Sequence, residues 1–131
     1  MAKLNQAQLM EIFEALRQEV APYIKGNIVA RINIEGKLDL WTEKKNMQVL
    51  DKTKDEMAFI TIIVQSGYVG FYFMPIYCLP EQISSKIGPE LMKQLKGKAC
   101  FHIKSTDPTI MAQVKAALAI GYAGFEKQGW V

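Results

Sequence analysis

The chain contains little that would commit it to one chemistry. It has only two cysteines, Cys78 and Cys100, and one histidine, and its 16 basic residues nearly balance 13 acidic ones, for a net charge of +3. Such a small excess does not require nucleic acid or a membrane as partner. The apolar runs at residues 57–60 and 62–64 are far too short to span a bilayer. Residues 1–6 lack the apolar core of a signal peptide, so we expect a cytoplasmic protein with reduced thiols.

The sequence also offers no specific catalytic motif. No Gly-rich phosphate loop, Ser-His-Asp series or pair of acid and base carboxylates can be assigned. Cys100 and His102 are two apart in a strand-like segment; with Cys78 they would supply three zinc ligands, or His102 would activate Cys100 as a nucleophile. Same-face neighbours on a strand lie about 6–7 Å apart at the backbone, and no fourth zinc ligand is evident. We interpret the pair as a packed thiol and a half-exposed imidazole, and predict no metal, no cofactor and no catalytic residue.

What is present is typical of one soluble globular domain spanning residues 1–131, with half of its residues apolar and 22% charged. A first helix is indicated by Asn5 as N-cap and Gln8 in a capping box, followed by apolar residues at helical spacing up to Pro22. A last helix begins after Asp107 and should end at Gly129.

Alternating apolar residues predict strands between these helices. Residues 28–34 should place Ile28, Ala30, Ile32 and Ile34 toward the core, and Arg31 and Asn33 outward. The next run places Leu38 and Leu40 inward, and Asp39 and Trp41 outward. Residues 43–56 are mostly charged, and we expect a mobile loop that includes at most a short edge strand near 47–50.

The clearest signal is a hairpin formed by residues 57–65 and 68–76 around Ser66-Gly67. A two-residue turn fixes the register, and opposed residues share a face. One face is entirely apolar: Ala58, Ile60, Ile62, Val64, Val69, Phe71 and Phe73. The other mixes large apolar groups with polar tips and a gap at Gly70: Phe59, Thr61, Ile63, Gln65, Tyr68, Gly70, Tyr72 and Met74. The second face is therefore a candidate binding surface.

The order of elements predicts an α+β fold, an antiparallel β-sheet of about five strands with the N- and C-terminal helices packed on one face. The other sheet face is then left without a helical cover. The outward positions of the separate strands converge on it: Arg31, Asp39, Trp41, Thr61, Tyr68, Tyr72, Met74, Cys100 and His102.

Two segments, residues 96–101 and 67–71, partly resemble the strand signature of RNA-recognition domains. That chemistry needs aromatic side chains on an open sheet face, where bases stack. Lys98 and Cys100 occupy the aromatic places in one segment, and the spacing is wrong in the other. We therefore do not expect nucleic acid as a partner.

Residues 72–77, 95–103, 121–122 and 128–130 resemble the YdhG-like bacterial proteins, a family largely of unknown function. The resemblance covers nearly the whole chain and implies a two-layer α+β sandwich, YdhG-like or frataxin-like. One branch is described as frataxin-like iron chaperones for iron–sulfur cluster or haem assembly. Iron handling of that kind depends on an acidic helix and edge strand, whereas the first helix here has only Glu11, Glu14 and Glu19. No iron-binding residue is therefore carried over.

We expect a small cytoplasmic binding protein that uses the open aromatic face of its sheet. Its occupant would be either a small apolar or aromatic ligand or a second copy of the chain, which would form a symmetric homodimer. The predicted ligand-binding residues are Arg31, Trp41, Tyr68, Tyr72, Met74, Tyr77 and His102, with Asp39 as a further polar group. The alternative, from the resemblance alone, is a frataxin-like iron chaperone.

Overall fold

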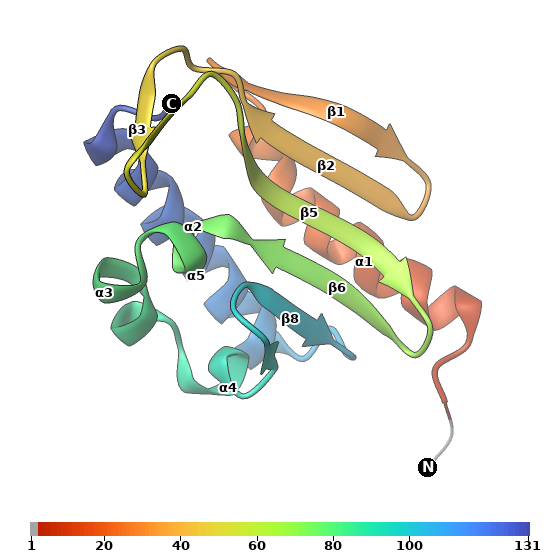
Figure 1. Cartoon of the computed structure of the whole chain (residues 1–131). Coiled ribbons are helices and arrows are strands. Elements are labelled where there is room, and N and C mark those ends of the chain that lie inside the picture. Colours follow the sequence, from red (N-terminus) through yellow and green to blue (C-terminus); the bar gives the residue numbers. More distant parts are fainter. Residues whose placement is uncertain (1–2) are drawn as a thin grey trace.

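The computed structural model describes residues 3–131, which form an α+β fold (Figure 1). A six-stranded antiparallel sheet has the order β1-β2-β5-β6-β8-β7, and β3 and β4 form a second, two-stranded sheet. The strands are β1 (Ile28–Ile34), β2 (Lys37–Thr42), β3 (Met47–Val49), β4 (Lys52–Lys54), β5 (Met57–Gln65), β6 (Tyr68–Phe73), β7 (Leu95–Lys96) and β8 (Cys100–Ile103). The helices are α1 (Gln6–Val20), α2 (Met74–Cys78), α3 (Pro80–Ile83), α4 (Pro89–Met92) and α5 (Pro108–Gln128), with 3₁₀ turns at Ala21–Tyr23 and Ser84–Lys86.

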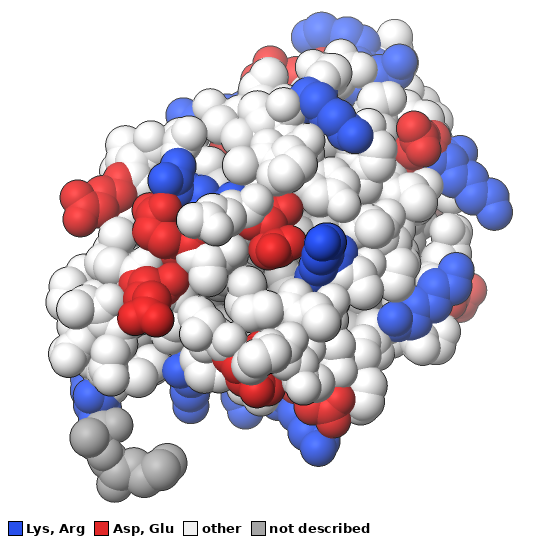
Figure 2. All heavy atoms as spheres, turned by 180° about the vertical axis from the view of Figure 1, so that it is seen from behind, with Lys and Arg blue, Asp and Glu red and all other residues white. Residues whose placement is uncertain are grey.

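The predicted fold class is confirmed, although the main sheet has six strands rather than about five. Helices α1 and α5 lie behind the sheet, and its front face is open (Figure 1). The helical side, seen from behind, carries interspersed basic and acidic side chains (Figure 2). Each main helix and the sheet has one apolar face. These faces must be buried against one another, which places the helices on one side of the sheet.

The two terminal helices begin and end where local signals predict. The Gln8 amide N–H donates to Asn5 Oδ1 (2.8 Å), and the Asn5 amide N–H donates to Gln8 Oε1 (2.9 Å), which completes the capping box of α1. Gly129 ends α5 in the left-handed region at φ +79°. The chain then turns back, so that Trp130 is buried and its indole N–H donates to the carbonyl of Gln48 (3.1 Å).

A β-bulge in β5 changes the predicted faces of two residues. The register of the β5–β6 hairpin is as predicted, from Gln65 opposite Tyr68 to Ile60 opposite Phe73. Toward β2, however, Leu40 pairs with Ile60 while Trp41 pairs with Ala58, so Phe59 is an extra residue. Phe59 is fully buried, in contact with aromatic rings of the core, and Ala58 lies beside Trp41 on the open side. The predictions that placed Phe59 outward and Ala58 inward are therefore wrong.

A second bulge, at Arg31, has the same effect in β1. Ala30 pairs with Leu40 and Ile32 with Asp39, so Ile32 shares the open face with Asp39. Asn33 then pairs with the fully buried Leu38 on the helical side, and Ile34 is 63% exposed. The expectation of Ile32 and Ile34 in the core is thus wrong for this edge strand, and Asn33, although exposed as expected, lies on the helical side of the sheet.

Two regions near the end of the sheet differ from the sequence prediction. The expected mobile loop contains the β3–β4 ribbon, closed by Leu50 and Asp51, whose φ values of +49° and +67° are those of a type I′ turn. Met47 and Val49 are buried while Lys52 and Lys54 are exposed. Strand β6 stops at Phe73, and α2 starts at Met74 with Pro75 in its first turn. Met74 and Tyr77 therefore belong to a helix.

Candidate functional site on the open sheet face

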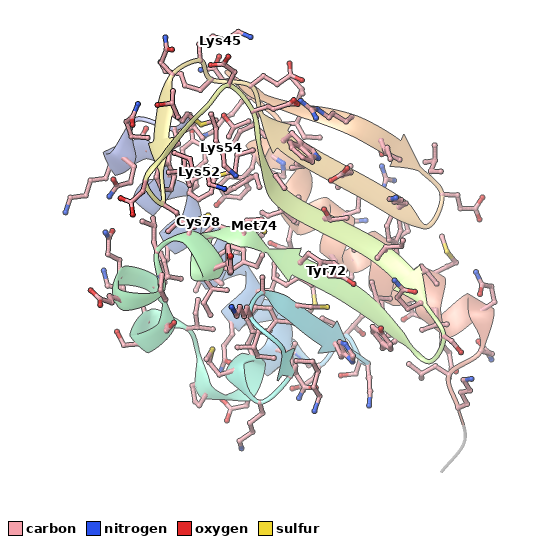
Figure 3. The ribbon with its side chains drawn as sticks, viewed as in Figure 1. Lys45, Lys52, Lys54, Tyr72, Met74 and Cys78 are labelled. Atoms are coloured by element: carbon pink, nitrogen blue, oxygen red, sulfur yellow. The ribbon has the colours of Figure 1, made fainter. Side chains whose placement is uncertain are left out.

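The uncovered side of the main sheet is the candidate site, and we call it the aromatic face. It is defined by the side chains of Arg31, Ile32, Asp39, Trp41, Thr61, Ile63, Tyr68, Tyr72, Cys100 and His102. Figure 3 labels Tyr72 on β6. The face results from the antiparallel pairing of β1, β2, β5, β6 and β8, which aligns every second residue. Most of these side chains are half-buried, so apolar surface and polar tips are both accessible.

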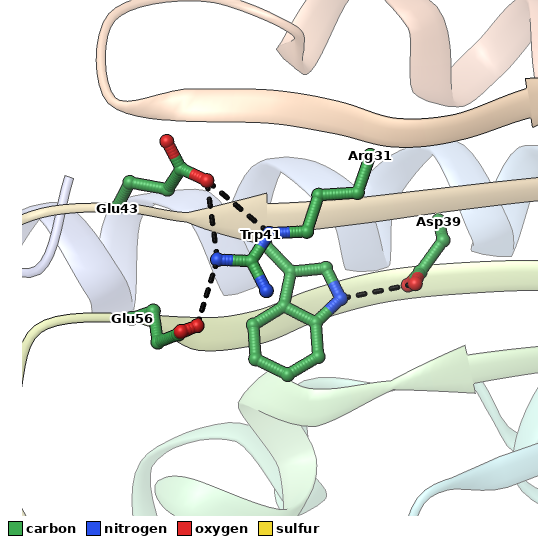
Figure 4. A network of polar contacts seen from close by, with 5 residues as sticks. All are labelled: Arg31, Asp39, Trp41, Glu43 and Glu56. Atoms are coloured by element: carbon green, nitrogen blue, oxygen red, sulfur yellow. Dashed lines mark hydrogen bonds and ion pairs between the residues drawn. The ribbon is translucent and has the colours of Figure 1, made fainter.

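Arg31 and Trp41 form a polar network at one side of the aromatic face (Figure 4). The Arg31 guanidinium carbon lies 4.2 Å from the centre of the Trp41 ring system, within cation–π range. Its Nη2 pairs with Glu43 (3.1 Å) and Glu56 (2.9 Å). Because two carboxylates already neutralise Arg31, this residue positions the Trp41 ring and offers little free charge to a ligand.

Both oxygens of the Asp39 carboxylate are also engaged within the protein. One carboxylate oxygen accepts the Trp41 indole N–H (3.0 Å), and the other accepts the Thr61 hydroxyl (2.8 Å). Asp39 thus fixes the orientation of Trp41 and links β2 to β5. Of the three polar residues that the sequence suggested as ligand-orienting groups, Arg31 and Asp39 are thus engaged within the protein, and His102 is the third.

Tyr68 and His102 stack on each other at the opposite side of the face. Their ring centroids are 3.8 Å apart with an interplanar angle of 10°. Burial lowers the pKa of His102, and the nearby charges of Lys96 and Lys104 lower it further. The imidazole is therefore neutral at pH 7 and extends the flat Tyr68 surface.

Tyr72 occupies the gap expected at Gly70. A Cβ atom on Gly70 would lie 3.0 Å from Tyr72 Cε1 and 3.5 Å from Ile63 Cγ2, so the missing side chain lets the Tyr72 ring lie close to the backbone. Polar contact with the opposite Cys100 thiol, followed by burial, raises the pKa of Tyr72. The Tyr72 phenol therefore remains neutral at physiological pH.

Met74 and Tyr77 lie beyond the sheet, on α2. Met74 is half-buried against the core, whereas Tyr77 is 40% exposed. The Lys98 ammonium lies 5.8 Å from the centroid of the Tyr77 ring. Lys52 and Lys54 on the β3–β4 ribbon approach α2 from the other direction (Figure 3). We call Met74, Tyr77, Lys52, Lys54 and Lys98 the α2 corner.

The ligand-binding residues predicted from sequence fall into two groups in the structure. Arg31, Trp41, Tyr68, Tyr72 and His102 share the aromatic face, while Met74 and Tyr77 are in the α2 corner. The lysines of that corner were missed. For Lys52 and Lys54 the only local signal was the Lys-Thr-Lys alternation, inside a segment expected to be a loop, and for Lys98 it was the basic bias of the surrounding residues.

The two cysteines have different surroundings. Cys78 is buried away from the aromatic face, with its sulfur 3.8 Å from that of Met57, and burial raises the pKa of its thiol. Burial also raises the pKa of the Cys100 thiol, partly offset by Tyr72. Among residues 3–131 no group of three or more His, Cys, Asp or Glu side chains is arranged to hold a metal ion. Of the three glutamates on α1, Glu14 is paired with Arg17 (2.7 Å).

Both thiols are expected to react with iodoacetamide more slowly at neutral pH than free cysteine does. A raised pKa leaves less thiolate, the reactive species, and burial slows Cys78 further. The measurement is alkylation at each site as a function of pH, followed by mass spectrometry of the intact protein and its peptides. A neutral-pH rate above that of free cysteine at either site would instead indicate a nucleophile.

The aromatic face is open rather than concave. Five surface hollows, the two largest of about 520 Å³ and about 420 Å³, are lined by residues of the helices, of β7–β8 and its following loop, and of the β1–β2 turn. None of the five includes a residue of the aromatic face or of the α2 corner.

Across residues 3–131, no helix has the length and apolar character needed to cross a membrane. Comparison with protein-family models, curated proteins and solved structures gives no match to this chain.

Proposed function

We propose that the protein is a cytoplasmic, non-catalytic binding protein whose ligand is a small molecule with a planar apolar body. The observation that carries this is the unequal cover of the sheet. Helices α1 and α5 cover one side (Figure 1), while Trp41, Tyr68 and Tyr72 on the other side are half-buried. Flat aromatic rings held by neighbouring groups lose little freedom when a planar molecule stacks on them.

The proposal also explains why the polar groups of the aromatic face contact its aromatic rings. Asp39 fixes the Trp41 indole and His102 stacks on Tyr68, so the rings are oriented before a ligand arrives. Such preorganisation lowers the entropic cost of binding. Because the aromatic face contributes to none of the five hollows, we expect affinities of about 10–100 μM, well short of those of enclosed sites.

An uncharged planar probe, N-phenyl-1-naphthylamine, is expected to bind and to increase in fluorescence on this face. Tyr72→Ala and Trp41→Ala should each weaken its binding about five- to tenfold, through loss of one stacking ring. Leu50→Ala, at the exposed tip of the β3–β4 ribbon, is the control and should leave affinity unchanged. The measurement is a fluorescence titration, with circular dichroism to verify folding. Unchanged affinity in both ring variants would place the site elsewhere.

A symmetric homodimer through the same face is the second candidate, supported by the charges at its two sides. Glu43 and Glu56 pair with Arg31 of β1 at one side of the sheet, whereas Lys96 of β7 and Lys104 after β8 lie at the opposite side. A two-fold axis parallel to the strands would place the acidic side of one subunit over the basic side of its partner. Light scattering on the wild type and on Tyr72→Glu measures the mass in solution. A wild-type dimer that becomes a monomer in the variant supports the homodimer.

A further inference from the structure

Three lysines lie near α2, two of them from β4 and one from the turn between β7 and β8. Lys52 and Lys54 are two apart on β4, so both project from the same side of the β3–β4 ribbon, and Figure 3 shows them between the ribbon and α2, next to Met74 and Cys78. Lys54 is close enough to Cys78 that its charge opposes the rise in the thiol pKa caused by burial. Lys98 reaches Tyr77 from the turn between β7 and β8.

These lysines have no acidic partner in the described part of the chain. The ion pairs within 4.0 Å among residues 3–131 are Arg17–Glu14, Arg31–Glu43 and Arg31–Glu56. The nearby Asp55 carboxylate accepts the Asn46 amide N–H (2.9 Å). Arg31, by contrast, is neutralised by two carboxylates. The α2 corner therefore combines uncompensated positive charge with the apolar surface of Met74 and Tyr77.

The corner continues directly from the aromatic face. Tyr72 is the last outward residue of β6, and α2 starts two residues later at Met74. Two residues of extended chain cover about 6–7 Å. A molecule whose flat body lies on Tyr72 can thus extend its charged end toward α2 and the lysines beside it. Lysine suits this role because its ammonium is a mobile point charge that meets an anion without fixed geometry.

We propose that the α2 corner anchors the anionic group of the ligand, and that the ligand class is a small aromatic anion bearing a carboxylate or phosphate. This rests on the proposed function, because the aromatic face supplies the site for the planar body. Lys52, Lys54 and Lys98 form the anionic subsite, and Tyr72 with Trp41 forms the aromatic one. Charge complementarity selects this occupant over a neutral or cationic molecule of the same shape.

Two matched probes separate the inference from the function on which it rests. 8-Anilinonaphthalene-1-sulfonate and N-phenyl-1-naphthylamine share one aromatic body, and only the first carries a sulfonate, which stands in for carboxylate or phosphate. The wild-type protein should bind the anion about tenfold more tightly than the neutral probe. That preference should shrink at high salt, because exposed charges are screened. This comparison needs no variant and so does not depend on any variant folding.

The triple variant Lys52→Gln, Lys54→Gln and Lys98→Gln should lose about tenfold in affinity for the anionic probe and change less than about twofold for the neutral one. The matched control removes three exposed lysines from the helical side, Lys86→Gln, Lys115→Gln and Lys127→Gln, and should preserve the preference. Equal binding of both probes by the wild type, or equal effects of the two triple variants, overturns the anionic subsite alone. Absence of neutral-probe binding overturns the proposed function and the subsite together.

Discussion

Replacing Phe59 by alanine is expected to lower the free energy of unfolding by about 3–5 kcal/mol. The ring is fully buried and lies 5.1 Å from Phe125, 6.4 Å from Tyr122 and 6.5 Å from Tyr23, measured between centroids. Its removal loses apolar burial and leaves a cavity at the junction of β5 with α5 and the 3₁₀ turn after α1. Since domains of this size are stable by about 5–15 kcal/mol, the variant should be close to unfolding.

The control is Ile63→Ala, which alters a residue that simple alternation assigns to the same face as Phe59. Ile63 is half-exposed on the aromatic face, so its truncation should cost less than about 1.5 kcal/mol. Urea denaturation followed by circular dichroism measures both, and Phe59→Leu serves as a milder variant if the alanine form does not fold. Similar small losses at both positions would contradict the bulge in β5.

Gly121→Ala is expected to destabilise the protein by about 1–3 kcal/mol, even though alanine favours helices. An added Cβ would lie 2.5 Å from Cζ of Phe73 and 2.9 Å from Cγ of Pro75. Both neighbours are buried where β6 passes into α2, so neither has room to move. Glycine at this position permits the close approach of α5 to the start of α2.

Gly124→Ala, one turn further along α5, is the matched control. Its Cβ would meet only the ends of flexible side chains, Leu79 Cδ1 at 3.1 Å and Ile83 Cδ1 at 3.3 Å. The gain in helix propensity of about 1 kcal/mol should therefore offset the crowding. Thermal unfolding of the two variants is the measurement, and equal midpoints would show that α5 does not depend on glycine at residue 121. Because α2 carries Met74 and Tyr77, Gly121→Ala should also weaken binding of the anionic probe.

Much of the site was accessible from sequence because local rules govern it. The Ser66-Gly67 turn sets the β5–β6 register, which in turn places Tyr68 and Tyr72 on the same face. The position of His102 beside Tyr68 follows from alternation in β8 once the strands pair. The ion pairs of Arg31 were not accessible, because Glu43 and Glu56 come from segments whose path the sequence leaves open.

The amino-acid sequence by itself determined the elements that carry their own signals: the capped α1, the Gly-terminated α5, the Ser66-Gly67 hairpin, and the α+β class. These depend on contacts within a few residues, so periodicity and turn chemistry suffice. Only the tertiary structure decided the two bulges, the helical state of residues 74–78 and the meeting of Lys52 and Lys54 with α2. Each of these depends on packing between segments far apart in the chain, which local propensity does not encode.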